Sequence, residues 1–237
     1  MLHTTRAVVL KTIRHGDSTV VLKAYTEALG LRSYLVRMGK KGGVSQAALQ
    51  PLNRIELVAQ GSPEKDLLAV RELRVDRPYL QIPFDPVRGA LTLFVQEVLY
   101  RTLRGESADA ELFAFLEEVL QAMDTAPDVR NFPLVFLVRY SEQLGIMPSP
   151  PEAGADHFDP AEGEFVLGAE RFGRTMGPPL SHHLAELLPL GFADMDRHLI
   201  PGAHRRELLD HLLLYYRMHV DGLSELRSPT VLHQVLG

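Results

Sequence analysis

The chain has 237 residues, of which 46% are hydrophobic and 23% are charged, and it contains no cysteine. This length fits one large domain or two small ones, and the composition is typical of a protein with a packed core. Without cysteine, disulfides and thiolate metal ligands are excluded. Because no apolar run reaches the ~18 residues of a membrane span and the first residues lack a signal-peptide pattern, we expect a cytoplasmic protein.

The net charge of -5 conceals an uneven distribution along the chain. Residues 1–77 hold 13 Lys+Arg and 7 Asp+Glu, a balance of +6, whereas residues 78–237 hold 12 and 23, a balance of -11. Such asymmetry indicates different roles for the two parts. The basic part is expected to attract a polyanion such as nucleic acid, and the acidic part to face something else.

The first 77 residues predict short strands with turn sequences between them. β-branched and aliphatic residues concentrate in five segments, which glycine-containing turns separate. The predicted strands are residues 6–13, 18–26, 31–38, 52–60 and 67–75, with a short helical turn at 44–49. Five strands with an insertion after the third are the pattern of an OB-fold barrel.

Three prolines between residues 77 and 86 break this pattern, and apolar residues then recur at helical spacing. The predicted helices are residues 87–103, 110–123, 131–144, 180–188, 205–220 and 229–236. The third is apolar over most of its surface, which is typical of the centre of a bundle. Residues 149–176, rich in Pro, Gly and acid, predict a loop or small hairpin. The expected class is therefore α+β: an OB-fold barrel at 1–78 and an all-helical domain at 79–237.

Three stretches, taken in their order and spacing, resemble one known family. The first holds Arg6, Val9-Leu10-Lys11, Gly16-Asp17, Tyr25-Thr26 and Gly30. The second runs from Ile82-Pro83-Phe84-Asp85 into Phe94–Tyr100, and the third holds Tyr215-Tyr216-Arg217, His219, Ser228, Val231-Leu232 and Val235-Leu236. Together they resemble the RecO family of DNA-repair mediators, and the tail resembles the family's Bacteroidetes-like branch.

The resemblance implies a non-enzymatic, nucleoid-associated protein that binds single- and double-stranded DNA and anneals complementary strands. It implies action with RecR, and optionally RecF, to load RecA onto DNA coated by single-strand-binding protein, whose acidic tail is a further partner. Many members hold zinc through a cysteine cluster. The corresponding stretch here offers only His157, Asp159, Glu162 and Glu164. We therefore expect neither metal nor cofactor, and packing in the metal's place.

The candidate phosphate contacts are the basic side chains of the expected barrel: Arg6, Lys11, Arg14, Lys23, Arg32, Arg37, Lys40 and Lys41. The last two lie in the glycine-rich loop 39–43, which can follow a bending backbone. The alternatives are a solvated strand face and a hairpin tip without a ligand. Tyr25 and Tyr34 are candidate stacking platforms, although burial in the core is the more ordinary interpretation.

Candidate contacts for the acidic tail are the arginines Arg139, Arg205, Arg206 and Arg217. Helix capping and intrachain ion pairs are the ordinary alternatives. The ten histidines lack the zinc-protease helix spacing and are interpreted as structural or surface residues. Two other functions stay open: an OB-fold interaction scaffold that does not bind DNA, and a hydrolytic or metal enzyme, for which no ligand cluster is recognisable.

Overall fold

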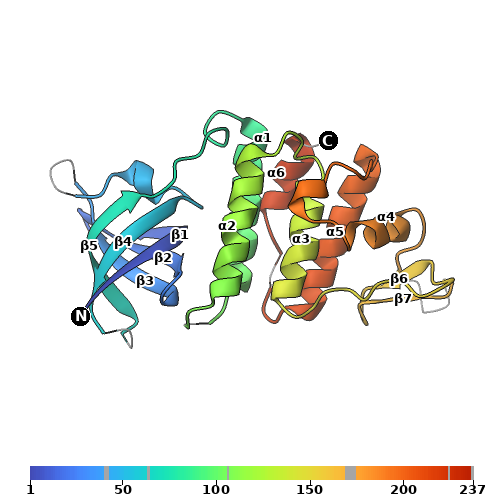
Figure 1. Cartoon of the computed structure of the whole chain (residues 1–237), viewed down its shortest axis with the longest axis horizontal. Coiled ribbons are helices and arrows are strands. Elements are labelled where there is room, and N and C mark those ends of the chain that lie inside the picture. The colour runs from blue at the N-terminus through green and yellow to red at the C-terminus, as the bar shows by residue number, and fades with distance from the viewer. Residues whose placement is uncertain (40–42, 63–64, 106, 169–174, 224, 236–237) are drawn as a thin grey trace. The chain divides into compact units, whose positions relative to one another are not determined.

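The computed structural model describes residues 1–39, 43–62, 65–105, 107–168, 175–223 and 225–235, and it has a closed five-stranded barrel followed by helices (Figure 1). This confirms the α+β class. The chain divides into two compact units. Unit 1 consists of residues 1–84 and 92–120, and unit 2 of residues 85–91 and 121–237.

The barrel has the strand order of an OB fold. Its strands are β1 (Leu2–Arg14), β2 (Thr19–Thr26), β3 (Gly30–Arg37), β4 (Arg54–Gln60) and β5 (Leu67–Val75). The order around the barrel is β1-β2-β3-β5-β4, and β3 pairs in parallel with β5, whereas the other neighbours are antiparallel. A 3-10 helix, η1 (Gln46–Leu49), follows β3. The predicted five strands with an insertion after the third are therefore confirmed.

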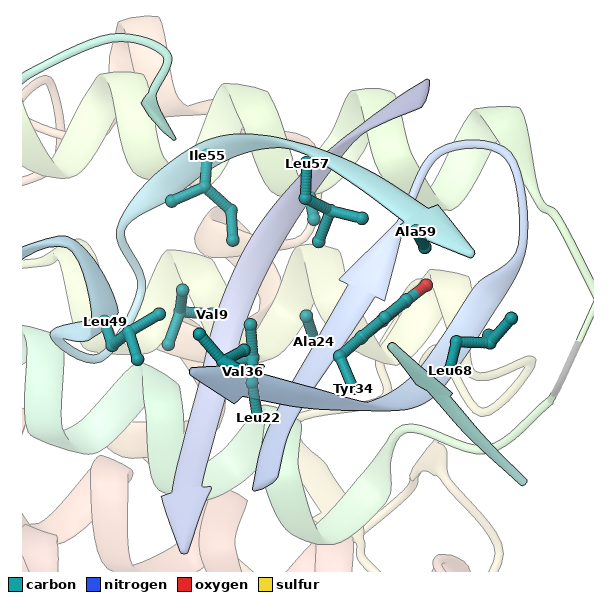
Figure 2. Packing of buried hydrophobic residues seen from close by; sticks show 11 residues of the cluster. Val9, Leu22, Ala24, Tyr34, Val36, Leu49, Ile55, Leu57, Ala59 and Leu68 are labelled. Atoms are coloured by element: carbon teal, nitrogen blue, oxygen red, sulfur yellow. The ribbon is translucent and has the colours of Figure 1, made fainter. Parts of the chain in front are cut away.

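The barrel closes around alternate residues of its strands, since successive side chains in a strand face opposite ways. Figure 2 shows the inward side chains gathered between the curved strands. This core consists of Ala7, Val9, Leu22, Ala24, Tyr34, Val36, Leu49, Ile55, Leu57, Ala59 and Leu68. The predicted start of the fourth strand is two residues early. Leu52 has a φ of 61° and turns the chain, so β4 begins at Arg54.

Six α-helices follow in the described part of the chain, each within three residues of its predicted bounds. They are α1 (Pro86–Thr102), α2 (Ala110–Thr125), α3 (Phe132–Gln143), α4 (Leu180–Leu187), α5 (Gly202–His219) and α6 (Ser228–Val235). Nine of the twelve residues of α3 are buried, which confirms its predicted central place. The hydroxyl of Tyr216 in α5 donates to the carbonyl of Leu137 in α3 at 2.6 Å. No described helix is long and apolar enough to cross a membrane.

The excursion between α3 and α4 contains a small hairpin of β6 (His157–Asp159) and β7 (Glu164–Val166). Phe158 is 2% exposed, and its ring lies 5.2 Å from that of Phe165 and 5.8 Å from that of Tyr215 in α5. His219 Nε2 bonds the Pro160 carbonyl at 2.8 Å. Aromatic packing on α5 thus holds this hairpin. Among the described residues, no three His, Asp or Glu side chains are arranged to hold a metal ion.

Candidate nucleic-acid interface

Four of the predicted basic residues lie together on neighbouring strands of the barrel. Lys11 in β1 pairs directly with Lys23 in β2, and Arg37 pairs with Thr19 at the far end of β2. Arg14 ends β1 opposite Val20, beside the turn that leads to Thr19, so by strand alternation it projects from the end of the barrel and not from the side that carries Lys11 and Lys23. We call Lys11, Arg14, Lys23 and Arg37 the basic face. Its position on the β1–β2–β3 side matches the surface through which OB folds bind oligonucleotides.

The charges of the basic face are largely uncompensated by the rest of the chain. In the described ranges, Lys11, Lys23 and Arg37 make no ion pair with a carboxylate. Arg14 has Asp17 at 4.0 Å, but its side chain is 82% exposed. An exposed pair at this distance is worth little. The four cations can therefore neutralise phosphates without first breaking a strong internal bond.

A groove of about 410 Å³ opens beside the basic face, at one end of the barrel. The β1–β2 turn, Met38 and η1 form its walls, and Arg14 reaches it. Met38 directly precedes the segment 39–43 in the sequence, which carries the next two predicted contacts. Lys40 and Lys41 themselves lie outside the described residues.

Arg6 and Arg32 do not join the basic face. Arg6 donates two hydrogen bonds to the carboxylate of Glu27, at 2.9 and 2.6 Å, and its guanidinium lies 5.3 Å from the ring centre of Phe113. The hydrogen bond raises the pKa of Arg6 and lowers that of Glu27. Arg32 pairs opposite the core residue Ala24, and its Nε is buried. Both therefore lie apart from the basic face, and Arg6 already pairs with a carboxylate.

The two tyrosines named as stacking candidates are core residues, as the more ordinary interpretation had it. Tyr25 is 1% exposed and Tyr34 is fully buried. Burial raises the pKa of Tyr25 to about 12, with a further contribution from Asp109, and burial also raises the pKa of Tyr34. Neither ring can stack on a base in this conformation.

Sequence reasoning missed Tyr100, an aromatic residue of α1 that meets the basic face. The Nζ atoms of Lys11 and Lys23 lie 4.5 and 6.0 Å from its ring centre. These residues all belong to unit 1. Helical spacing marks a face of α1, but nothing local in the sequence indicates which strand residues that face meets.

In unit 2, three arginines rim an apolar cleft, which we call the arginine pocket. Its lining consists of Arg130, Pro133, Leu134, Arg205, Arg206, Leu209, Leu232 and His233. Two of the four predicted tail contacts, Arg205 and Arg206, are thus brought together with Arg130, which sequence reasoning missed. Burial lowers the pKa of Arg205, and the charge of Arg130 adds to this effect. The cleft is narrow, at about 20 Å³, which is space for one or two waters.

The other two predicted tail contacts lie elsewhere in unit 2. Arg139 in α3 forms an intrachain ion pair with Glu142 at 2.5 Å, the alternative to tail binding that the sequence also allows. Arg217 lines a second groove between α5 and α6, whose walls also include Asp210 and Glu225. That groove therefore carries both signs of charge.

Three histidines and a carboxylate form a hydrogen-bonded series, which we call the histidine chain. Glu186 Oε2 lies 2.5 Å from His198 Nδ1, His198 Nε2 lies 2.9 Å from His183 Nδ1, and His183 Nε2 lies 3.1 Å from His204 Nδ1. Burial lowers the pKa of His183, and the neighbouring His198 and His204 lower it further. The series links α4 to α5 and to the segment between them, a structural role.

The chain is similar to known proteins over nearly its whole length. Residues 1–79 match the family model described as Recombination protein O N terminal, and residues 83–228 match Recombination protein O C terminal. It is 34% identical to DNA repair protein RecO of Porphyromonas gingivalis, over 98% of both chains. It is 31% identical to DNA repair protein RecO of Bacteroides fragilis, over 99% of both. These matches confirm the resemblance, including its Bacteroidetes-like branch.

Proposed function

Because this chain belongs to the RecO family of DNA-repair proteins, we propose that it is a non-enzymatic recombination mediator that binds single- and double-stranded DNA through the basic face. We further propose that it anneals complementary strands. With RecR, and optionally RecF, it would help to load RecA onto DNA coated by single-strand-binding protein, in the cytoplasm at the nucleoid. The observation that carries the proposal is a group of four cations on β1, β2 and β3 of an OB-fold barrel, of which Lys11, Arg14 and Arg37 are exposed and Lys23 is half-buried.

Phosphate contacts of this kind give binding that does not depend on base sequence but depends strongly on salt. Four contacts to a single strand give a slope of about -2.8 in a plot of log affinity against log salt concentration. Affinity would then fall roughly 50-fold between 50 and 200 mM salt. A protein that neutralises the phosphates of two strands also lowers their mutual repulsion, which favours annealing.

The test is a fluorescence-anisotropy titration of a labelled single strand at several salt concentrations. The variant Arg14→Ala plus Arg37→Ala should reduce the steepness of the salt slope by about 1.4. The matched control is Arg71→Ala plus Arg74→Ala, which removes the same charge from β5. Those two side chains are held by Gln60 and Glu56 respectively.

Equal effects of the two double variants would mean that only the total charge matters, and the basic face would lose its role. Negligible binding of the unmodified protein at ~0.1 M salt would favour the alternative, an interaction scaffold that does not bind DNA. A strand-annealing assay with and without single-strand-binding protein then separates a mediator from a simple DNA-binding protein.

We propose the arginine pocket as the site for the acidic tail of single-strand-binding protein. Its apolar floor and the guanidinium groups of Arg205 and Arg206 suit a peptide that is acidic and ends in apolar residues, whereas the third guanidinium, that of Arg130, already pairs with Asp128. The groove at Arg217 suits such a peptide less well, because Asp210 and Glu225 would repel it. A tail side chain would have to open the narrow cleft as it enters.

The variant Arg206→Glu should weaken binding of a tail peptide at least tenfold, whereas Arg217→Glu should leave it nearly unchanged. Both residues are exposed on α5, so the two variants are matched in helix and in charge. The opposite result would place the tail in the groove at Arg217.

A further inference from the structure

A β-bulge in β1 decides which way Lys11 faces. Val9 points into the barrel core, and regular alternation would point residue 11 the same way. The register shifts between Val9 and Lys11, so that Lys11 comes to lie opposite Lys23. The neighbours of Lys23 along β2, Leu22 and Ala24, are core residues, so Lys23 and its partner face outward. Bulges commonly re-aim a side chain in this way.

Helix α1 holds this irregular segment through two residues one turn apart. Gln96 Nε2 donates to the carbonyl of Leu10, the residue within the bulge, at 2.7 Å. Four residues later on the same helix face, the ring of Tyr100 lies 4.5 Å from Lys11 Nζ and 6.0 Å from Lys23 Nζ. Gln96 therefore holds the bulge, and Tyr100 contacts the two lysines that the bulge places opposite each other.

The resulting arrangement of charges is costly for the free protein. Like charges directly opposite each other on two strands destabilise a sheet. Within the described ranges, neither Lys11 nor Lys23 has a carboxylate partner. The face of an aromatic ring attracts an ammonium group but does not neutralise it. Two ammonium groups held side by side in this way suit a polyanion whose charges are closely spaced.

We propose that Lys11 and Lys23 bind the phosphodiester backbone as one unit and that Tyr100 is the positioning residue that fixes their ammonium groups relative to each other. The proposal rests on the proposed function and makes it more specific. It also makes the interface composite. The lysines lie in the segment that matches the N-terminal family model, and Tyr100 lies in the segment that matches the C-terminal one.

The first test compares Tyr100→Leu with Tyr100→Phe in salt-dependent anisotropy titrations of a labelled single strand with the full-length protein. Phenylalanine keeps the ring, so the salt slope should stay within error of that of the unmodified protein. Leucine leaves both charges in place but removes the ring, and should reduce the steepness of the slope by about 0.7, one phosphate contact. If only part of the Tyr100→Leu protein folds, its apparent affinity falls by the same factor at every salt concentration, and the salt slope is unchanged. An unchanged slope in Tyr100→Leu would overturn the proposal.

The second test does not depend on whether Tyr100→Leu folds. Lys11→Ala, Lys23→Ala and the double variant are surface changes, and their affinities form a double-mutant cycle. If the two lysines act as one unit, each single variant should lose nearly as much affinity as the double variant. If the affinity loss of the double variant instead equals the product of the two single-variant losses, the lysines act independently and the proposal is contradicted.

These results can be told apart from a failure of the proposed function itself. If Arg14→Ala plus Arg37→Ala flattens the salt slope while Tyr100→Leu does not, DNA binding by the basic face stands and only the role of Tyr100 is lost. If the unmodified protein shows no salt-dependent binding, both proposals fall together.

Discussion

Arg88 is a buried cation that joins the start of α1 to the end of α2 in unit 2. Its side chain is 4% exposed. The Nε group donates to Asp85 Oδ2 at 3.1 Å, Nη2 donates to the Ala126 carbonyl at 2.6 Å, and Nη1 donates to the Met123 carbonyl. Met123 lies in the last turn of α2 and Ala126 directly follows the helix, where carbonyls lack partners within the helix. One guanidinium thus satisfies three acceptors.

The variant Arg88→Met keeps most of the apolar stem but leaves these acceptors without the cation. Asp85 keeps its bond from the backbone N–H of Val87, at 2.8 Å, so the main loss falls on the two carbonyls. Two carbonyl acceptors left unsatisfied, at about 1–3 kcal/mol each, give a loss of about 2–6 kcal/mol. Since domain stability is about 5–15 kcal/mol, the effect should be large.

Urea unfolding followed by far-ultraviolet circular dichroism measures this loss. The matched control is Arg139→Met, which removes a partly exposed pair with Glu142 within α3 and should cost about 0.2–0.5 kcal/mol. If Arg88→Met lowered the free energy of unfolding by less than about 1 kcal/mol, or by no more than the control does, the hydrogen bonds of Arg88 would contribute little to stability.

Three further predictions concern stability and charge. Gly30→Ala should lower the free energy of unfolding, measured by thermal denaturation, by about 1–3 kcal/mol. The reason is that φ of Gly30 is +65° and a new Cβ would lie 2.3 Å from the carbonyl oxygen of Ser107. The control Gly105→Ala also has a positive φ, but its Cβ would meet no other atom, so it should cost less. Because the pKa of His183 is lowered in the folded state, that state binds fewer protons, so stability is full above the unfolded pKa of about 6.5 and falls below it. His183→Gln should flatten the pH dependence of the urea midpoint, and an unaltered profile would count against the histidine chain. Arg6→Ala should lower stability by at most about 1 kcal/mol and leave the DNA salt slope as it was; a flatter slope would restore Arg6 as a phosphate contact.

The sequence predicts most of the fold because its local signals agree with the final structure. The β-branched segments became strands, and the apolar positions at helical spacing became helices. The bulge at Leu10 could not be predicted in this way. Residues 7–10 are all apolar and buried, Val8 and Leu10 as well as the inward-facing Ala7 and Val9. Such a run shows no alternation of apolar and polar residues, so the sequence does not reveal the residue at which the inward and outward positions exchange.

The candidate site was only partly predictable, because pairing between distant residues decides which cations are available. Arg6 is held by Glu27, which lies 21 residues away, and no local pattern announces that bond. Tyr100 meets lysines that precede it by more than seventy residues. The positive charge of residues 1–77 predicts that nucleic acid binds in this half, but only the structure shows that Arg6 pairs with Glu27 whereas Arg37 lies on the basic face.

The central claim is that nucleic acid lies on the basic face, and lysine reactivity tests it most directly. The chain has only five lysines, at positions 11, 23, 40, 41 and 65, so acetylation of each can be followed by mass spectrometry. At a saturating concentration of single-stranded oligonucleotide, Lys11 and Lys23 should be strongly protected. Equal acetylation of Lys11 and Lys23 with and without the oligonucleotide, at a concentration where anisotropy shows full binding, would contradict the account.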